Sequence, residues 1–326
     1  MGVEPVLDEV ERVRAWYWRF AEHYEAGGAV SYARIARALA TDDEVVGLVL
    51  GLPRGNKRQP NLLLGAVRFL GGPVEDWEAF RAWLVEHWDA VREVVSERMT
   101  QTNEVRRCAA LVPVLATLAG PLGLVEVGAS AGLCLYPDRY RYSYDGAAPI
   151  GPVDSPVLLE CSTSGGVPVP GRVPEVAWRA GVDLNPLNAA DEGDVRWLEA
   201  LIWPGAQEGA RRARLRAAAS VAAADPAPIV AGDLVEEVAG LVSRVPRGVT
   251  PVVVHSAVLT YLPVVERERF AALMGELPGH WVSYEGWRVF PELEGGRGPV
   301  DTDMTVAVDG RVVAWAGEHG HSLTWA

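Results

Sequence analysis

The sequence predicts an α/β protein in which a helical N-terminal domain precedes a mostly parallel sheet, with helices on both faces and an antiparallel hairpin at the end. Two observations lead to this fold class. Apolar residues recur at helical spacing up to about residue 119, and short apolar runs then alternate with helical segments. Gly120-Pro121 separates the two patterns. We therefore expect one domain over 1–119 and a second over 120–326.

Composition and charge limit the class of protein. The chain has 326 residues, of which 49% are hydrophobic and 22% charged, as in a globular protein with a core. The net charge of -13 argues against binding to nucleic acid or to an anionic membrane surface, since both need a cationic patch. Three cysteines without redox or metal-ligand spacing, and no signal peptide, favour a cytoplasmic location.

The first domain reads as a series of amphipathic helices separated by Gly, Pro and polar loops. The expected helices cover 8–25, 32–40, 41–51, 60–70, 77–99 and 104–118. We expect Thr41 to cap the third helix, because acidic residues follow it in the first turn. Arg54, Lys57 and Arg58 lie in a polar loop, which predicts either a solvated surface or attraction of an anionic substrate.

The second domain is organised around residues 122–135. The apolar run 122–127 predicts a buried strand, and the small residues from Gly128 to Gly132 predict a tight turn that opens a helix near Ser130. Small side chains let backbone amides approach a ligand closely, and a helix N-terminus favours electron-rich groups. The sequence therefore predicts a binding site at this turn.

The remaining segments continue the alternation, apart from an expected β insertion at about 137–178 that contains a hairpin. The later strands are expected at 180–185, 229–233, 251–257 and 280–285, with the terminal hairpin at 304–318. Ligands of parallel sheets bind beyond the carboxyl ends of the strands. Asp183, Asp233 and His255 all fall at such ends.

The stretch Glu126-Val127-Gly128-Ala129-Ser130-Ala131-Gly132 resembles the first motif of class I S-adenosylmethionine-dependent methyltransferases, an acid followed by a Gly-x-Gly-x-Gly turn. Here Ser130 stands at the central glycine. The resemblance covers residues 120–326 and implies a Rossmann-like sheet, S-adenosylmethionine as cofactor and a small-molecule acceptor. The whole chain, with residues 101–107 and the final His319-Gly320-His321, also resembles DUF2332, a bacterial family of unknown function.

The methyltransferase resemblance implies a role for each residue of the motif. Gly128, Ser130 and Gly132 would approach the methionine part of the cofactor. Glu126 would hold a water, a backbone amide or the ammonium group. Asp183 would accept both ribose hydroxyls, which suits an acceptor-only carboxylate, and Asp233 would hold the adenine amino group.

Several further side chains are predicted to act on the substrate. We expect His255 to be the general base, with Tyr261 or Glu285 behind it. Gln101, Asn103 and Arg107 would form a polar wall of the pocket. These side chains also have structural interpretations. Asp183, Asp233 and the residues of the polar wall could cap helices, and His255, Tyr261 and Glu285 could pack in the core. His319 and His321 have no third ligand, so no metal site is predicted.

Two other functions remain open. Gly128 to Gly132 also matches Gly-x-Ser-x-Gly, the nucleophile elbow of α/β-hydrolases, which would make Ser130 the nucleophile of an esterase. It ranks lower because about 120 helical residues precede the turn, no His-Gly oxyanion motif lies upstream, and Glu126 has no hydrolase role. The third candidate is a non-catalytic binding protein with the methyltransferase fold.

Overall fold

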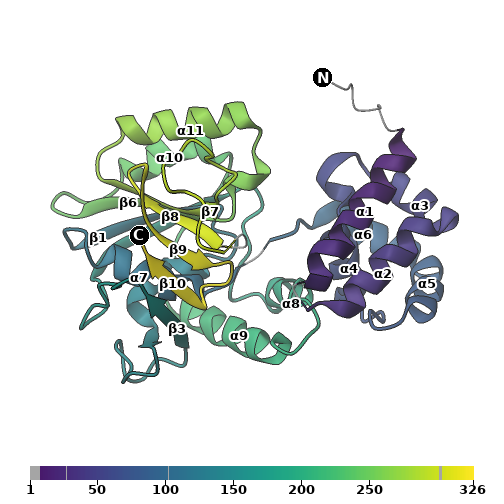
Figure 1. The fold of residues 1–326 in the computed structure, drawn as a ribbon, viewed down its shortest axis with the longest axis horizontal. Helices are drawn as coiled ribbons and strands as arrows, with labels where there is room; N and C mark the ends of the chain where they lie inside the picture. Colours follow the sequence, from purple (N-terminus) through teal and green to yellow (C-terminus); the bar gives the residue numbers. More distant parts are fainter. Residues whose placement is uncertain (1–7, 27, 102, 301–302) are drawn as a thin grey trace. The chain divides into compact units, whose positions relative to one another are not determined.

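A computed structural model describes residues 8–26, 28–101, 103–300 and 303–326. The chain forms two compact units (Figure 1). The helical unit comprises Met1–Thr102 with Gly193–Ala213, and the sheet unit comprises Asn103–Glu192 with Arg214–Ala326. The units differ from the expected boundary at residue 120, because residues 103–119 group with the sheet and a later segment groups with the helices.

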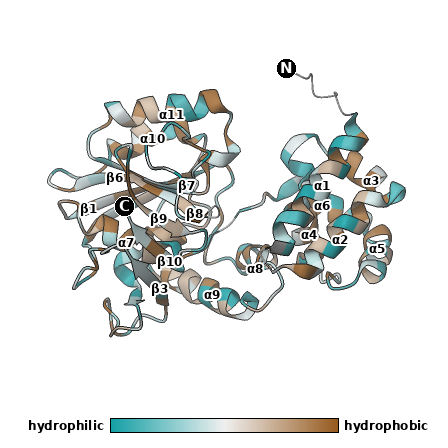
Figure 2. Cartoon of the chain, in the orientation of Figure 1, coloured by the Kyte–Doolittle hydropathy of each residue, from teal (hydrophilic) through white to brown (hydrophobic). Residues whose placement is uncertain are grey.

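The helical unit is built largely as the apolar periodicity predicts. Its N-terminal segment holds α1 (Glu9–Ala26), α2 (Val30–Thr41), α3 (Asp43–Leu50), η1 (Gly55–Arg58), α4 (Pro60–Phe69), α5 (Trp77–Glu86) and α6 (Trp88–Glu97). Helices α1 and α2 carry hydrophobic and hydrophilic residues in alternation along their length (Figure 2). The single helix expected over 77–99 is broken, because His87 leaves helical dihedrals (φ -108°, ψ 19°) and its ring stacks on Trp83.

The cap of α3 lies one residue later than expected. Thr41 ends α2, and its hydroxyl donates to the carbonyl of Ala38. Asp42 is the N-cap of α3: its Oδ1 accepts from the amide of Val45 at 2.9 Å. A carboxylate before a helix satisfies an amide that the helix cannot pair and also suits the helix dipole.

Replacing Asp42 with alanine should therefore lower the stability of the helical unit by about 1 kcal/mol, the usual contribution of such a cap. The side chain also pairs with Arg81 at 2.7 Å, which adds to the loss. Urea denaturation followed by circular dichroism measures the change. Asp89→Ala is the matched control, because its side chain is 91% exposed. Equal stabilities of the two variants would contradict the capping role.

The basic loop of the helical unit closes helix ends and is not simply solvated. The buried Arg58 donates to the carbonyls of Leu50 and Leu52 at 2.6 and 2.8 Å. Lys57 donates to the carbonyl of Arg98 at 2.8 Å. Cations at helix C-termini satisfy carbonyls that lack partners within the helix. Arg54 is 82% exposed and pairs with Glu9 at 2.8 Å.

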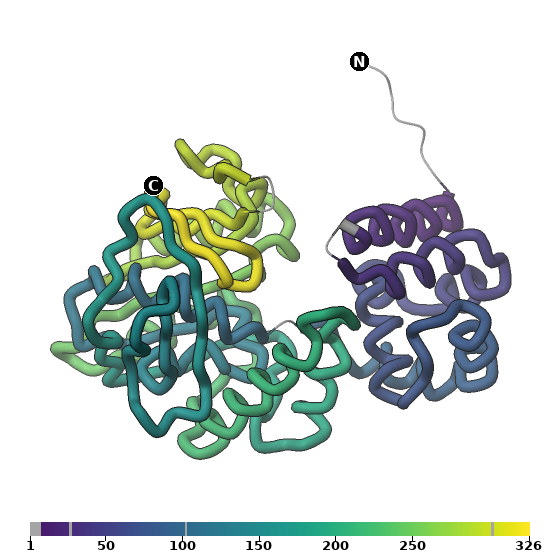
Figure 3. The backbone as a smooth tube through the Cα atoms, turned by 60° about the horizontal axis from the view of Figure 1, so that its bottom comes forward, coloured from purple at the N-terminus to yellow at the C-terminus, as the bar shows by residue number. Residues whose placement is uncertain are grey.

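The sheet unit contains one ten-stranded sheet, with the order β2-β3-β10-β9-β8-β7-β6-β1-β4-β5. Its strands are β1 (Leu122–Val127), β2 (Arg141–Tyr144), β3 (Leu158–Ser164), β4 (Val176–Asp183), β5 (Ile229–Ala231), β6 (Thr250–Ser256), β7 (His280–Gly286), β8 (Asp303–Val308), β9 (Arg311–Gly317) and β10 (Ser322–Trp325). Strands β5, β4, β1, β6 and β7 pair in parallel, and β8, β9 and β10 follow antiparallel. The predicted mixed α/β class with a terminal antiparallel hairpin is confirmed. Strand β10, which lies beside β3, was not predicted from the sequence (Figure 3).

The helix expected near Ser130 is absent. After β1 the chain forms two short 3-10 turns, η2 (Leu133–Leu135) and η3 (Pro137–Arg139). Ser130 and Gly132 have φ of 52° and 67°, and a left-handed backbone at both positions is incompatible with the start of an α-helix. The expected hairpin of the β insertion is also wrong, because β2 and β3 pair in parallel.

Helices cover the two faces of the parallel strands. Here α10 (Leu234–Val242) and α11 (Val264–Glu276) pack over one face, where Val125, Val253 and Phe270 share a buried cluster. On the other face, α7 (Arg107–Leu115) lines a small cavity with Leu124 and Glu126. The remaining helices are α8 (Glu192–Ala200) and α9 (Glu208–Ala224). Alternation along each strand therefore decides which helical layer a side chain meets.

Candidate functional site

The candidate site lies where the strand order reverses. Strand β1 has β4 on one side and β6 on the other, and all three run parallel. Chain connections leave the carboxyl ends of these strands in opposite directions, and a crevice at this point is where open parallel sheets bind ligands. Glu126, the turn from Gly128 to Gly132, and Asp183 all belong to this end of the sheet unit.

The turn after β1 packs closely against neighbouring side chains of the sheet unit. Gly128 and Gly132 have φ of 69° and 67°, a conformation that disfavours any other residue. A Cβ at Gly128 would lie 2.3 Å from Val258, and one at Gly132 would lie 2.9 Å from Ile229. The close approach that the two glycines permit is therefore to neighbouring side chains. Their predicted contact with the methionine part of a cofactor stays a prediction.

The two predicted aspartates bind backbone amides. Oδ2 of Asp183 accepts from the amide of Ser130 at 2.8 Å, and Oδ1 accepts from the amide of Asn185 at 2.8 Å. Asp183 thus ties the turn after β1 to the end of β4. Asp233 is the N-cap of α10 and accepts from the amide of Val235 at 2.8 Å. Each carboxylate oxygen can accept more than one hydrogen bond, so neither contact excludes a ligand hydroxyl or amine.

Glu126 and Ser130 present buried oxygens that no other group satisfies. Their side chains belong to residues that are 6% and 3% exposed. Glu126 Oε2 and Ser130 Oγ have no hydrogen-bond partner within the part of the chain that the structure describes. Burial raises the pKa of Glu126 well above 4.5, electrostatic interactions with Cys134 and Asp183 raise it further, and the positive charge of Arg107 lowers it. Buried polar atoms are nearly always paired in native proteins, so these two oxygens at the end of β1 make the turn a candidate ligand site.

Two of the residues predicted to form a polar wall, Asn103 and Arg107, bind backbone groups of the sheet unit, and only Asn103 binds the turn after β1. Asn103 donates from Nδ2 to the carbonyl of Ala129 at 2.9 Å and accepts from the amide of Leu133 at 3.2 Å. Arg107 is 2% exposed and donates to the carbonyls of Ser256 and Glu318, both at 3.1 Å. Arg107 therefore holds a fixed positive charge near Glu126.

Gln101 was predicted to join the same wall. It belongs to the helical unit, whereas Asn103 and Arg107 belong to the sheet unit. Its predicted contact with the substrate remains a prediction.

His255 does not lie at a cavity mouth. Its ring is fully buried under α11, in edge-to-face contact with Phe270 at 5.6 Å. Trp281 donates its indole N–H to Nε2 at 2.8 Å, so the ring proton is on Nδ1, which donates to Glu285 Oε1 at 2.8 Å. Both ring nitrogens are occupied, and a general base needs a free one.

Glu285 serves the same buried cluster. Besides His255, its Oε1 accepts from the amides of Val258 and Leu259 at 2.9 and 3.0 Å, which caps the loop after β6. Glu126 pairs in register with Val254, so it lies on the sheet face opposite to His255. The predicted constellation is therefore split between two layers. Tyr261 is 56% exposed, and of the three predicted catalytic side chains it alone reaches solvent.

Comparison with known families gives a match over nearly the whole chain. The family described as uncharacterized protein conserved in bacteria (DUF2332) matches residues 14–325. The chain belongs to the DUF2332 family. No curated protein and no solved structure matches the chain significantly. The resemblance of the whole chain to DUF2332 is thereby confirmed, and the methyltransferase resemblance stays a proposal.

Two further features of this DUF2332 chain complete the site description. Across residues 8–26, 28–101, 103–300 and 303–326, no group of three or more His, Cys, Asp or Glu side chains is arranged to hold a metal ion. In the same ranges, no helix combines the length and apolar character needed to cross a bilayer.

Trp281, the hydrogen-bond partner of His255, was not predicted from the sequence. Strand alternation offered a signal for it, since Trp281, Ser283 and Glu285 share one face of β7, and His255 pairs in register with Ser283. In the DUF2332 chain this places the indole and the carboxylate on the same side of the sheet as the imidazole.

Proposed function

We propose that the sheet unit binds S-adenosylmethionine at the carboxyl end of β1 and transfers its methyl group to a small molecule. The observation that carries the proposal is the pair of buried, unpartnered oxygens, Glu126 Oε2 and Ser130 Oγ, at the point where the strand order reverses. Both atoms await a hydrogen-bonding group that the described chain does not supply.

The charges at this end of the sheet support this cofactor. S-adenosylmethionine carries two positive groups, a sulfonium and an ammonium, and one carboxylate. Glu126 and Asp183 interact electrostatically with each other, and Arg107 is the cation nearby. A ligand cation beside Glu126 would favour its charged form and offset the cost of burial. Glu126 would thus complement a positive group of the cofactor, and Arg107 its carboxylate.

In methyl transfer the protein mainly positions the two reactants and forms no covalent bond with them. S-adenosylmethionine supplies a methyl group bonded to positively charged sulfur, and the protein positions the acceptor in line with it. In this role Glu126 and Ser130 would orient the cofactor. His255 would not serve as the base, because Trp281 and Glu285 occupy its nitrogens. The exposed Tyr261 is the predicted side chain that can contact an acceptor.

One observation favours the esterase alternative. The φ of 52° at Ser130 is the strained backbone that a nucleophile elbow requires. A hydrolytic serine also needs a base within hydrogen-bond reach, and Ser130 Oγ has no such partner in the described chain. The geometry therefore supports cofactor binding more than acyl transfer. Labelling of the wild type by a fluorophosphonate, and its loss in Ser130→Ala, would reverse this order.

Calorimetric titration of the full chain with S-adenosylmethionine tests the proposal. We expect saturable binding by the wild type and at least a tenfold (~1.4 kcal/mol) weaker affinity for Asp183→Ala, because charge-assisted hydrogen bonds are lost. S-adenosylhomocysteine, which lacks the sulfonium charge, should bind more weakly than S-adenosylmethionine. Glu268→Ala, an exposed acid on α11, is the control. Absence of binding by the folded wild type would overturn the proposal, and binding without methyl transfer to any acceptor would favour a non-catalytic protein.

A further inference from the structure

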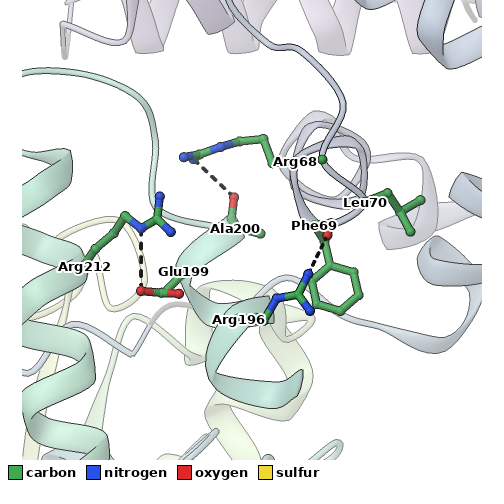
Figure 4. A pocket seen from close by; sticks show the side chains of 8 residues that line it. Arg68, Phe69, Leu70, Arg196, Glu199, Ala200 and Arg212 are labelled. Atoms are coloured by element: carbon green, nitrogen blue, oxygen red, sulfur yellow. Dashed lines mark hydrogen bonds and ion pairs between the residues drawn. The ribbon is translucent and has the colours of Figure 1, made fainter. Parts of the chain in front are cut away.

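The helical unit contains a polar cavity of about 290 Å³ beside the C-terminal ends of α4 and α8. Three arginines line it, Arg68, Arg196 and Arg212, together with Phe69 and the carboxylate of Glu199 (Figure 4). None of these residues takes part in the proposed cofactor site. A concave site with several convergent polar groups is the usual form of a small-ligand pocket.

Arg68 forms a fixed side of the cavity. Its side chain is 12% exposed and forms an ion pair with Glu208. It also donates to the carbonyls of Ala200, at 3.4 Å, and Ile202. These carbonyls follow the end of α8, where a cation offsets the negative end of the helix dipole. The donors of Arg68 are thus used by the protein itself.

Arg196 and Arg212 are held much more loosely. Within the described residues, the side chain of Arg196 makes one hydrogen bond, to the carbonyl of Phe69 at 3.4 Å, and its guanidinium lies 5.3 Å from the centre of the Phe69 ring. Arg212 lies 3.6 Å from Glu199 and 3.7 Å from Glu208, beyond good hydrogen-bond distance, and its side chain is 47% exposed. A guanidinium has five N–H donors, so most of the donors of both side chains remain available to a ligand.

We propose that this cavity binds the phosphate group of a small phosphorylated molecule. A guanidinium recognises an oxyanion through two parallel hydrogen bonds. The guanidinium groups of Arg196 and Arg212 together can bind an anion that has three or four oxygens. A carboxylate has only two oxygens, which is enough for one guanidinium group. The cavity lining has three cations and one carboxylate, and Glu208 outside the lining pairs with Arg68 and Arg212, so these side chains still carry a net charge of +1 in a protein of net charge -13. Such a local positive potential in a concave site attracts polyvalent anions.

Titration of the full chain with inorganic pyrophosphate at constant ionic strength tests this site. We expect saturable binding by the wild type, and Arg196→Ala and Arg212→Ala each to weaken it at least about tenfold. Arg196→Lys keeps the charge but loses the planar pair of donors, so it should also weaken binding. Arg12→Ala, at an exposed position of the same unit, is the matched control. Circular dichroism confirms that each variant is folded.

Three outcomes would overturn the proposal: no saturable binding by the wild type at millimolar pyrophosphate, equal affinities of the wild type and both alanine variants, or equal loss in Arg12→Ala. Titration with citrate distinguishes a phosphate site from a site for polycarboxylates. Weaker binding of citrate supports a phosphate site, and equal or tighter binding would assign the cavity to polycarboxylates instead. Because Glu126 and Asp183 take no part, failure here leaves the cofactor proposal unaffected.

Discussion

Replacing Glu285 with leucine is expected to lower the free energy of unfolding by about 3–5 kcal/mol, as breaking a buried charged network does. One oxygen of this carboxylate accepts from His255 Nδ1 and from the amides of Val258 and Leu259, within 2.8–3.0 Å. Leucine would leave all three donors buried without an acceptor, and each unpaired donor costs about 1–3 kcal/mol. Chemical denaturation monitored by tryptophan fluorescence measures the loss.

Glu285→Gln separates a structural role from a catalytic one. Its amide oxygen can still accept the same hydrogen bonds, so most of the stability should remain. Glu268→Leu, an exposed position on α11, should change stability by less than about 0.5 kcal/mol. A small effect of Glu285→Leu, similar to that of Glu268→Leu, would contradict the buried network.

Glu126→Gln is expected to raise the stability of the sheet unit by more than about 1 kcal/mol at pH 7.5, because the wild type must either take up a proton or bury a carboxylate without a hydrogen-bond partner on Oε2 when it folds. Burial raises the pKa of Glu126 well above its usual 4.5, so the folded protein holds this proton more tightly than the unfolded chain. The protonated form of Glu126 makes its full contribution to the free energy of unfolding below pH 4.5. This contribution is lost as the pH rises through the raised pKa. The advantage of the variant should therefore shrink as the pH is lowered toward 5, which thermal melts at several pH values measure.

The same substitution should weaken S-adenosylmethionine binding at least about tenfold, since an amide cannot pair with the ligand cation as a carboxylate does. A residue that costs stability and supports binding is the pattern expected of a functional site. Loss of stability in Glu126→Gln at neutral pH would contradict the unpartnered carboxyl. Unchanged affinity for S-adenosylmethionine would remove Glu126 from the proposed site.

The sequence predicted helices and strands correctly where a single local signal specifies them. The apolar run 122–127 forms β1, and Pro60 begins α4 as a proline at the first helical position should. The predictions failed where the same residues suit two local structures. Thr41 and Asp42 both suit an N-cap, and only the path of the backbone selects Asp42. The turn after β1 has helix-compatible residues, yet left-handed dihedrals at Ser130 and Gly132 exclude a helix.

Residue types and short-range spacing are enough to predict a buried strand with an acid and a small-residue turn at its end, and acids after the neighbouring strands. Which of these groups remain available to a ligand depends on long-range packing, which local patterns do not contain. Register places Glu126 and His255 on opposite faces of the sheet, and long-range hydrogen bonds commit His255 to Trp281 and Glu285. Such pairings join residues about 30 positions apart. Glu126 Oε2 and Ser130 Oγ are left without partners by the same packing, which makes the turn after β1 the candidate site.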